Sequence, residues 1–160
     1  MLLSRRGKGG PMDLYQIIKR DHQKAKRLFE RLGEAIGEGG KARDRLFAEL
    51  KHELEIHTEL EEKYFYPALR DHDEAESLIE EALEEHGDVK EALATLEQAD
   101  RDDPSWAEQI ADLDQDVEHH VEEEENEIFP LARRLLDERR TAEIARSFEQ
   151  AKAAAQKTGD

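Results

Sequence analysis

Cysteine is absent from the sequence, and this absence removes several kinds of site at once. Disulfide bonds, thiolate zinc sites and iron–sulfur clusters all require cysteine sulfur. A metal ion in this protein would therefore have to be bound by histidine, by carboxylate or by tyrosine oxygen.

Basic residues are few compared with acidic ones. The chain has 24 Lys and Arg residues against 41 Asp and Glu residues, which gives a formal net charge of −17. Nucleic-acid binding needs clustered Lys and Arg that neutralise phosphates, and an anionic membrane surface repels an acidic chain. We therefore expect neither a nucleic-acid partner nor a membrane partner.

Long hydrophobic runs are also missing. Residues 1–11, MLLSRRGKGGP, contain a two-leucine apolar run that is too short for a signal peptide or a membrane anchor. We interpret residues 1–11 as a flexible leader, and we expect a soluble cytoplasmic protein.

Glycine and proline are sparse, and their positions divide the chain into helices. The first helix runs from about Asp13 to the GEGG stretch at residues 37–40, and the second covers about residues 42–69. The third covers about residues 74–98, and the DRDDPS loop precedes a fourth that ends near residue 136. Residues 141–156 predict a fifth, weaker helix. Because no segment alternates with the period of two that marks a strand, the predicted fold class is all-α.

The helices repeat. The second and fourth helices superpose at an offset of 63 residues, which pairs Phe47 with Ile110, Leu54 with Val117, His57 with His120, Glu61 with Glu124, and Phe65 with Ile128. The first and third superpose at an offset of 64, which pairs Leu14 with Leu78, His22 with His86, Ala25 with Val89, and Leu32 with Leu96. This duplicated helical hairpin predicts an up-down four-helix bundle over residues 12–137. Residues 138–160 would add a short C-terminal helix and tail.

The helical register separates neighbouring ionisable residues in the HHVEEEENEIFP stretch. With Val117 at zero, the apolar side chains of the fourth helix fall within about 40° on either side; they are Ile110, Leu113, Val121, Ile128, Leu131 and Leu135. Glu124 falls at about −20° and His120 at about −60°, so both face the core. His119 and Glu123 fall at about 200° and 240°, and both point outwards.

The same register places His57 and Glu61 among apolar residues of the second helix. A His and a Glu at positions i and i+4 lie one above the other, close enough to reach a common ion. His22 and His86 flank the apolar faces of the other two helices. The predicted bundle therefore directs four imidazoles and two carboxylates to one level.

A single His–Glu pair of this spacing is usually a surface contact. Two pairs at matched core positions, with two further matched histidines, argue against that interpretation. Burying an uncompensated carboxylate costs several kcal/mol, and a divalent cation would compensate it. We assign the remaining histidines His52, His72 and His119 to the surface, and we read Glu122–Glu125 as a solvated run with one functional member, Glu124.

Together these motifs resemble the haemerythrin-like (HHE cation-binding) family, in which a helical bundle holds a non-haem di-iron centre. The resemblance rests on EEKYFYP and EENEIFP after the paired motifs as well as on the ligand order. It implies two iron ions joined by an oxo or hydroxo bridge, which zinc or manganese could replace. It implies the ligands His22 and His57 for one iron, His86 and His120 for the other, and Glu61 and Glu124 as bridges.

One departure from oxygen-carrying haemerythrins affects the expected function. Those proteins have a further histidine four residues after the ligand of the third helix, where this chain has Lys90. Both metals would then keep an open position, which favours redox chemistry, peroxide reaction or NO binding over reversible O₂ carriage. Tyr64, one turn beyond Glu61, could approach the site, but we favour a role in aromatic packing.

The leading hypothesis is a di-iron protein that binds or senses O₂, NO or peroxide. The alternatives are a peroxidase- or catalase-like enzyme on the same centre, or a metal-stabilised, iron-responsive interaction module. A homodimer formed through the fifth helix is a further alternative. The predicted apolar access shell, which suits a small ligand, consists of Ile18, Leu54, Phe65, Ala82, Val117 and Ile128.

Overall fold

The computed structural model describes residues 12–38 and 40–158, and in these residues it contains helices and turns but no strand. The leader assigned to residues 1–11 lies outside the described residues. The elements are α2 (Leu14–Ile36), α3 (Gly40–Leu60), η1 (Glu61–Phe65), α4 (Tyr66–Arg70), η2 (Asp73–Ala75), α5 (Glu76–Gln98), α6 (Pro104–Glu123), η3 (Glu124–Ile128), α7 (Phe129–Leu135) and α8 (Glu138–Thr158). Among the described residues, none of these helices is both long enough and apolar enough to cross a membrane.

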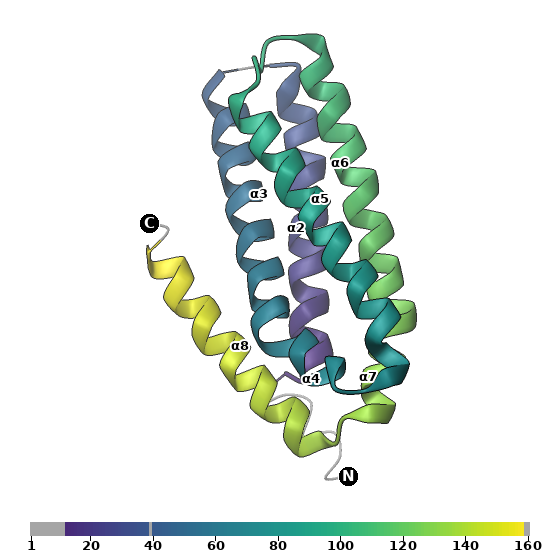
Figure 1. The fold of residues 1–160 in the computed structure, drawn as a ribbon. Helices are drawn as coiled ribbons and strands as arrows, with labels where there is room; N and C mark the ends of the chain where they lie inside the picture. The colour runs from purple at the N-terminus through teal and green to yellow at the C-terminus, as the bar shows by residue number, and fades with distance from the viewer. Residues whose placement is uncertain (1–11, 39, 159–160) are drawn as a thin grey trace, which may run out of the picture.

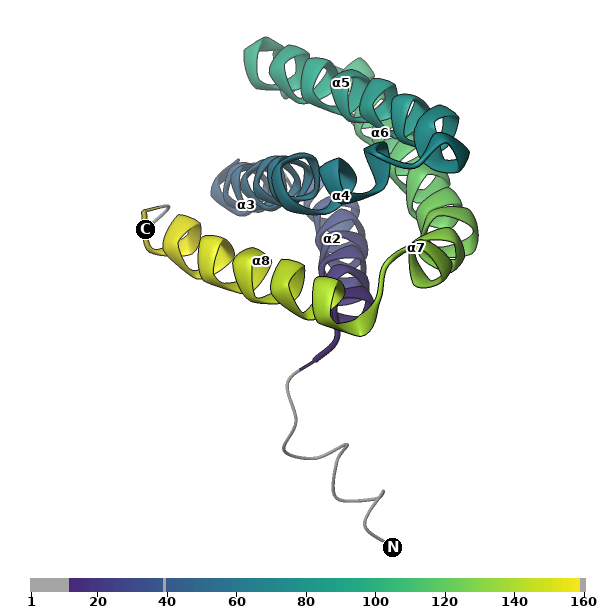
Figure 2. The same cartoon turned by 60° about the horizontal axis from the view of Figure 1, so that its bottom comes forward.

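The helices form a bundle of two hairpins, which confirms the predicted all-α fold. The hairpin α2–α3 packs beside the hairpin α5–α6, and α2 contacts both α3 and α6 (Figures 1 and 2). The fifth long helix, α8, packs obliquely against α2, α3 and η1 (Figure 2). It starts three residues before the predicted fifth helix and ends two residues after it.

Local sequence signals set the beginnings of these helices. At the start of α2 the Asp13 carboxylate accepts a hydrogen bond from the Gln16 backbone, while the Gln16 side chain accepts one from the Asp13 backbone. Before α6, the Asp103 carboxylate accepts from the Ser105 N–H, and a proline follows at the first helical position. Gly40 begins α3 with φ of 70°, a left-handed conformation that suits glycine.

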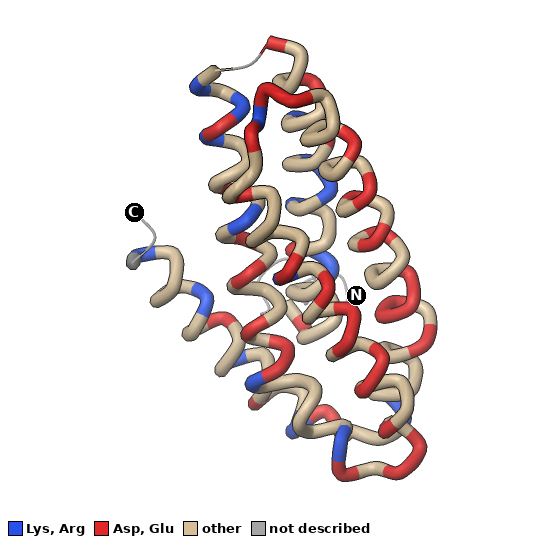
Figure 3. The backbone as a smooth tube through the Cα atoms, turned by 45° about the horizontal axis from the view of Figure 1, so that its top comes forward, with Lys and Arg blue, Asp and Glu red and all other residues tan. Residues whose placement is uncertain are grey.

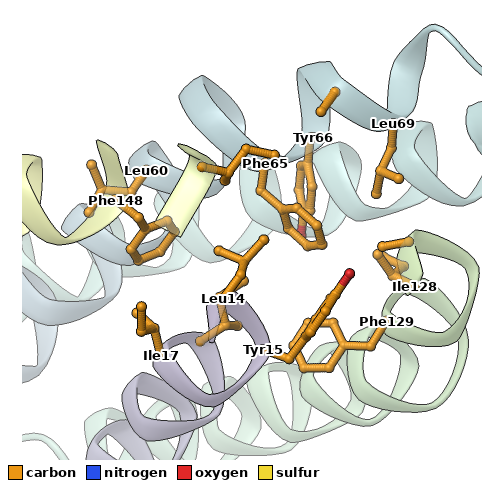
Figure 4. Close-up of a cluster of buried hydrophobic side chains, with 14 of the residues drawn as sticks. Leu14, Tyr15, Ile17, Leu60, Phe65, Tyr66, Leu69, Ile128, Phe129 and Phe148 are labelled. Atoms are coloured by element: carbon orange, nitrogen blue, oxygen red, sulfur yellow. The ribbon is translucent and has the colours of Figure 1, made fainter. Parts of the chain in front are cut away.

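The buried apolar side chains form two clusters, one toward each end of the bundle. The tryptophan cluster surrounds Trp106 and Phe47, whose rings meet edge to face at 5.3 Å. The α8-side cluster includes Tyr15, Phe65 and Phe129, and Phe148 of α8 completes it (Figure 4). Along every long helix of the bundle, the candidate ligands lie between residues of the two clusters. Apolar packing on both sides therefore isolates this level of the bundle from water.

Two short π-helical segments interrupt the long helices at matching places. η1 begins at Glu61 and η3 begins at Glu124, so each segment starts at a candidate ligand. Each π turn takes up an extra residue, so the register of the following α-helix shifts. Leu131 and Leu135, which the unbroken register places on the apolar face, consequently pack at the edge of the α8-side cluster. Both are only partly buried, and Phe129 and Ala132 are fully buried instead.

Candidate metal centre

The six predicted ligands converge at one level of the bundle. His22 comes from α2, His57 from α3, His86 from α5 and His120 from α6, while Glu61 and Glu124 open η1 and η3. All six are buried, with both glutamates at 0 % exposure and no histidine above 8 %. Buried glutamate is rare unless it is compensated, so this layer requires an explanation beyond packing.

Four of the side chains form a first group. The donor atoms of His22, His57, Glu61 and Glu124 all lie within 4.8 Å of one another. The His22 Nε2 lies 3.0 Å from the Glu124 Oε1, and the His57 Nε2 lies 3.3 Å from the Glu61 Oε1. Two imidazoles and two carboxylates thus present their donor atoms to one small volume.

A second group shares Glu61 with the first. The Glu61 Oε1 lies 3.2 Å from the His86 Nε2, and the Nε2 atoms of His86 and His120 are 3.1 Å apart. The second carboxylate is more distant on this side, since the Glu124 Oε2 lies 3.8 Å from the His120 Nε2. Glu61 therefore stands between the two histidine pairs, as a bridging ligand would.

Tyr66 is a member of the site that the sequence reasoning missed. Its hydroxyl donates a hydrogen bond to the Glu124 carboxylate and lies 3.3 Å from the Glu61 Oε1. It also lies 3.4 Å from the His86 Nε2 and 3.5 Å from the His120 Nε2. Tyr64, the tyrosine considered from the sequence, is partly exposed and packs at the edge of the α8-side cluster.

The aromatic packing role favoured for Tyr64 is confirmed, and the π segment explains why the helical register does not point to Tyr66. Counting 100° per residue from Glu61 assumes an unbroken α-helix, whereas η1 has a wider turn that brings residue 66 over residue 61. The internal repeat could have pointed to Tyr66, because it pairs Tyr66 with a second aromatic residue directly after the other π segment. Tyr66 is the counterpart of Phe129, which is fully buried and whose ring is nearly parallel to that of His22.

Each of the four histidines is held from behind by a carboxylate on a neighbouring helix. The Nδ1 atoms of His22, His57, His86 and His120 lie 2.7, 2.9, 2.8 and 2.7 Å from carboxylate oxygens of Glu125, Asp21, Glu62 and Glu85, respectively. A carboxylate that accepts the Nδ1 proton leaves the Nε2 lone pair free for a metal, and this arrangement accompanies most metal-binding histidines. We call these four residues the outer carboxylates.

The outer carboxylates follow the same repeat as the ligands. Glu62 and Glu125 are separated by 63 residues, and Asp21 and Glu85 by 64. Each one directly precedes or directly follows a candidate ligand in the sequence. The run Glu122–Glu125, read as solvated with Glu124 as its one functional member, therefore has a second member at the site, because the Glu125 carboxylate contacts the His22 Nδ1.

The sequence comparison decides the family. Residues 13–132 match the family described as Hemerythrin HHE cation binding domain. The chain belongs to the haemerythrin HHE cation-binding family. The resemblance recognised in the sequence is thereby confirmed.

Several individual proteins are similar to this HHE domain. The uncharacterized protein Rv2633c of Mycobacterium tuberculosis is 33% identical over 119 residues, which cover 74% of this chain and 71% of that protein. The crystal structure of an HHE domain-containing Rv2633c homolog from Mycobacterium kansasii superposes with a TM-score of 0.74 at 25% identity and covers 90% of both chains. A DNA nickase of Nostoc sp. is 27% identical over 141 residues, but the matched part spans 39% of that longer protein.

The HHE site has the features that a bound cation would satisfy. The His22 Nε2, His57 Nε2, Glu61 Oε2 and Glu124 Oε1 are buried and make no hydrogen bond within the described part of the chain. Buried polar atoms without partners are costly, and all four belong to residues of the first ligand group. Imidazole nitrogen and carboxylate oxygen are the donors that iron, manganese and zinc accept. The residues present therefore fit a metal site.

The electrostatics of the HHE site shift several pKa values. Burial alone would lower the pKa of His120, but the hydrogen bond to Glu85 and the charges of Glu124 and Glu61 raise it to about 9. Burial acts against the charged form of Glu61 as well, yet the neighbouring His57 brings its pKa well below the usual range. A metal cation would replace the protons that these anionic groups attract.

A small cavity adjoins the HHE site on the side of the tryptophan cluster. It has a volume of about 30 Å³ and touches all four candidate histidines. Its apolar lining consists of Ala25, Leu54, Val89, Val117 and Val121. Leu54 and Val117 belong to the predicted access shell, whereas Ile18, Phe65, Ala82 and Ile128 lie in the α8-side cluster.

Proposed function

We propose that this HHE domain holds two metal ions, with iron as the natural choice, and uses the centre to bind or sense a small ligand such as O₂, NO or peroxide. The observation that carries the proposal is the convergence of four carboxylate-backed imidazoles on two buried glutamates. His22 and His57 would bind one metal and His86 and His120 the other. Glu61 and Glu124 would bridge them.

The chain's own residues would determine what reaches the centre. A cavity of about 30 Å³ accommodates a molecule of the size of water or a diatomic gas, and its apolar lining favours an uncharged ligand. An organic substrate would require a larger pocket with several polar groups. When bound, iron would supply redox chemistry and an electrophilic position for the ligand.

Tyr66 supports a second candidate, a peroxidase- or catalase-like enzyme. Burial first, and then the charges of Glu124 and Glu61, raise the pKa of Tyr66 well above its ordinary value. The phenol therefore keeps its proton and holds it next to the candidate ligands, where it could act as a general acid that protonates a reduced oxygen species. In a catalase reaction two H₂O₂ molecules give two water molecules and one O₂, so no other co-reactant is needed.

A nucleic-acid function is not favoured for this chain. Acidic residues follow α5 and α6 along most of their length (Figure 3), and the net charge is −17. Such a surface repels the phosphate backbone. The activity in the nickase's name belongs to a protein of which this domain matches a minor part.

Metal analysis combined with optical spectroscopy tests the proposal. We expect two irons per chain and near-ultraviolet bands of an oxo-bridged ferric pair that shift when azide, NO or peroxide is added. A colourless protein with a single zinc per chain would overturn it.

A cavity variant tests access separately. Val117→Leu would narrow the cavity without replacing a candidate ligand, so the iron content should stay the same while azide binding slows.

Peroxide turnover distinguishes the enzyme from the sensor. O₂ release from added peroxide, at one O₂ per two peroxides consumed, would favour the enzyme over the sensor. Loss of that release in Tyr66→Phe, with unchanged iron content, would assign the proton to Tyr66.

A further inference from the structure

Helix α8 reaches the metal level through a buried lysine. Lys152 is 7 % exposed, and its ammonium contacts the Oδ1 of Asp21, which is 6 % exposed. The other oxygen of Asp21, Oδ2, lies 2.9 Å from the Nδ1 of His57. Lysine is almost never buried without a partner, so this contact fixes the position of the ammonium. Lys152, Asp21 and His57 thus form a continuous chain from α8 to a candidate ligand.

A second side chain of α8 contacts the same ligand. Phe148 precedes Lys152 by one helical turn and lies on the same face of α8. Phe148 is fully buried, and its ring meets the His57 ring edge to face with the centroids 6.1 Å apart. One face of α8 therefore contacts His57 both directly and through the carboxylate behind it.

Among the described residues, the other histidine pair, His86 and His120, has no buried equivalent of this arrangement. The counterpart of Asp21 is Glu85, whose side chain is 21% exposed. The Glu85 Oε1 lies 2.7 Å from the His120 Nδ1, and its other oxygen lies 3.9 Å from His119, a side chain that is 65% exposed. Behind His86, the Nζ of Lys90 lies 3.3 Å from the Glu62 Oε2, but the Lys90 side chain is 48% exposed. A buried ammonium therefore contacts the carboxylate behind His57, whereas the carboxylates behind His86 and His120 contact exposed cationic side chains.

We propose that Lys152 is a positioning residue for the metal centre: it fixes Asp21, and Asp21 orients His57 toward the metal held by His22 and His57. This inference rests on the metal site proposed above. A carboxylate held between two partners has a defined orientation, and it fixes the orientation of the imidazole that is hydrogen-bonded to it. The fifth helix accordingly makes the two metal positions unequal, although the ligands themselves are duplicated.

Three variants test this role against a merely structural one. Lys152→Met removes the ammonium but keeps an unbranched chain, Lys152→Arg keeps the charge, and Lys157→Met removes an exposed lysine from the same helix. Metal affinity is measured by competition with a chromogenic chelator. We expect Lys152→Met to lower the binding affinity for one of the two metal ions by about 10–100-fold, as removal of outer hydrogen-bond partners does. We expect Lys152→Arg to recover most of the loss and Lys157→Met to match the unaltered protein.

The ¹⁵N signals of the His57 ring provide a second readout, recorded after metal removal. They should shift in Lys152→Met and remain in place in Lys157→Met, because they report the Asp21 contact directly. If Lys152→Met lowers thermal stability but leaves both the metal affinities and these signals unchanged, the positioning role is overturned. If Lys152→Met does not fold, Lys152→Gln replaces it and must show the same changes.

These readouts also separate the positioning role from the proposed function. A protein that binds no metal, yet whose His57 signals shift in Lys152→Met, would refute the metal site and leave the orientation of His57 by α8 in place.

Discussion

The outer carboxylates permit a graded prediction. Replacing Glu125 by glutamine leaves an oxygen that can accept the His22 Nδ1 proton but removes the negative charge. A hydrogen bond to an ionised acceptor is roughly twice as strong as a neutral one. Loss of an outer partner weakens metal affinity by about 10–100-fold, equivalent to about 1.4–2.7 kcal/mol.

Burial determines where in that range each variant should fall. The side chains of Glu125 and Glu62 are 30% and 29% exposed, so water compensates part of the loss. We expect about 10-fold for Glu125→Gln and for Glu62→Gln. The Asp21 side chain is 4% exposed and bridges two partners. Asp21→Asn should therefore approach about 100-fold, the upper end of the range.

The assay is chelator competition for Fe²⁺ without oxygen, and for Zn²⁺ as a redox-inactive check, at one pH and one salt concentration. Glu127→Gln is the matched control, because Glu127 belongs to the same π segment as Glu125 but is exposed. It should leave the affinity unchanged. The reasoning is refuted if Glu127→Gln weakens binding as much as Glu125→Gln, or if Asp21→Asn binds metal as tightly as the unaltered protein.

Three other predictions concern the ligand level itself. Glu124→Ala should abolish metal binding, whereas Glu123→Ala should leave it intact; equal metal content in the two variants would contradict the register. Tyr66→Phe removes a buried hydrogen bond to a carboxylate and should lower the free energy of unfolding of the metal-stripped protein by about 1.5–3 kcal/mol in urea titrations. Tyr64→Phe should change it by less than about 0.5 kcal/mol. Because the pKa of His120 is raised from 6.5 to about 9, its contribution to stability is complete below pH 6.5 and is lost as the pH rises toward 9. The melting temperature of the metal-stripped protein should therefore fall between pH 6.5 and 8. Above pH 8 the buried Lys152, whose pKa is lowered to about 8, loses its proton more readily in the folded state and raises the stability again. A melting temperature that rises between pH 6.5 and 8 would contradict the assignment.

The sequence alone predicted the bundle and the six residues at its centre. His57 with Glu61 and His120 with Glu124 could be found because register and repeat are properties of single helices. Those two signals coincide at the level of the site, because each helix is regular α-helix up to the glutamate that opens its π segment. The family resemblance then supplied the expected pairing of histidines with metals, and that pairing stays a prediction.

Other parts of the site depend on contacts between helices, which the register of one helix does not reveal. Glu62 and Glu125 look like members of solvated acidic runs, and only the neighbouring helix shows that they reach a histidine. Lys152 belongs to a helix with no counterpart in the repeat, so duplication could not point to it. Tyr66 was missed for a different reason, because the π turn changed the geometry of its own helix.

The two π segments also bear on how this duplicated fold could have arisen. They begin 63 residues apart, the same distance that relates the two paired motifs. The simplest account is that the extra residue entered a single ancestral hairpin before that hairpin was duplicated, since two later insertions would have had to fall at the same place. The aromatic residues that follow now differ, since one is the hydroxyl-bearing Tyr66 and the other is Phe129. Placing Phe at position 66 would make the two halves more alike, and the difference in behaviour between that variant and the present protein would measure what the hydroxyl of Tyr66 contributes.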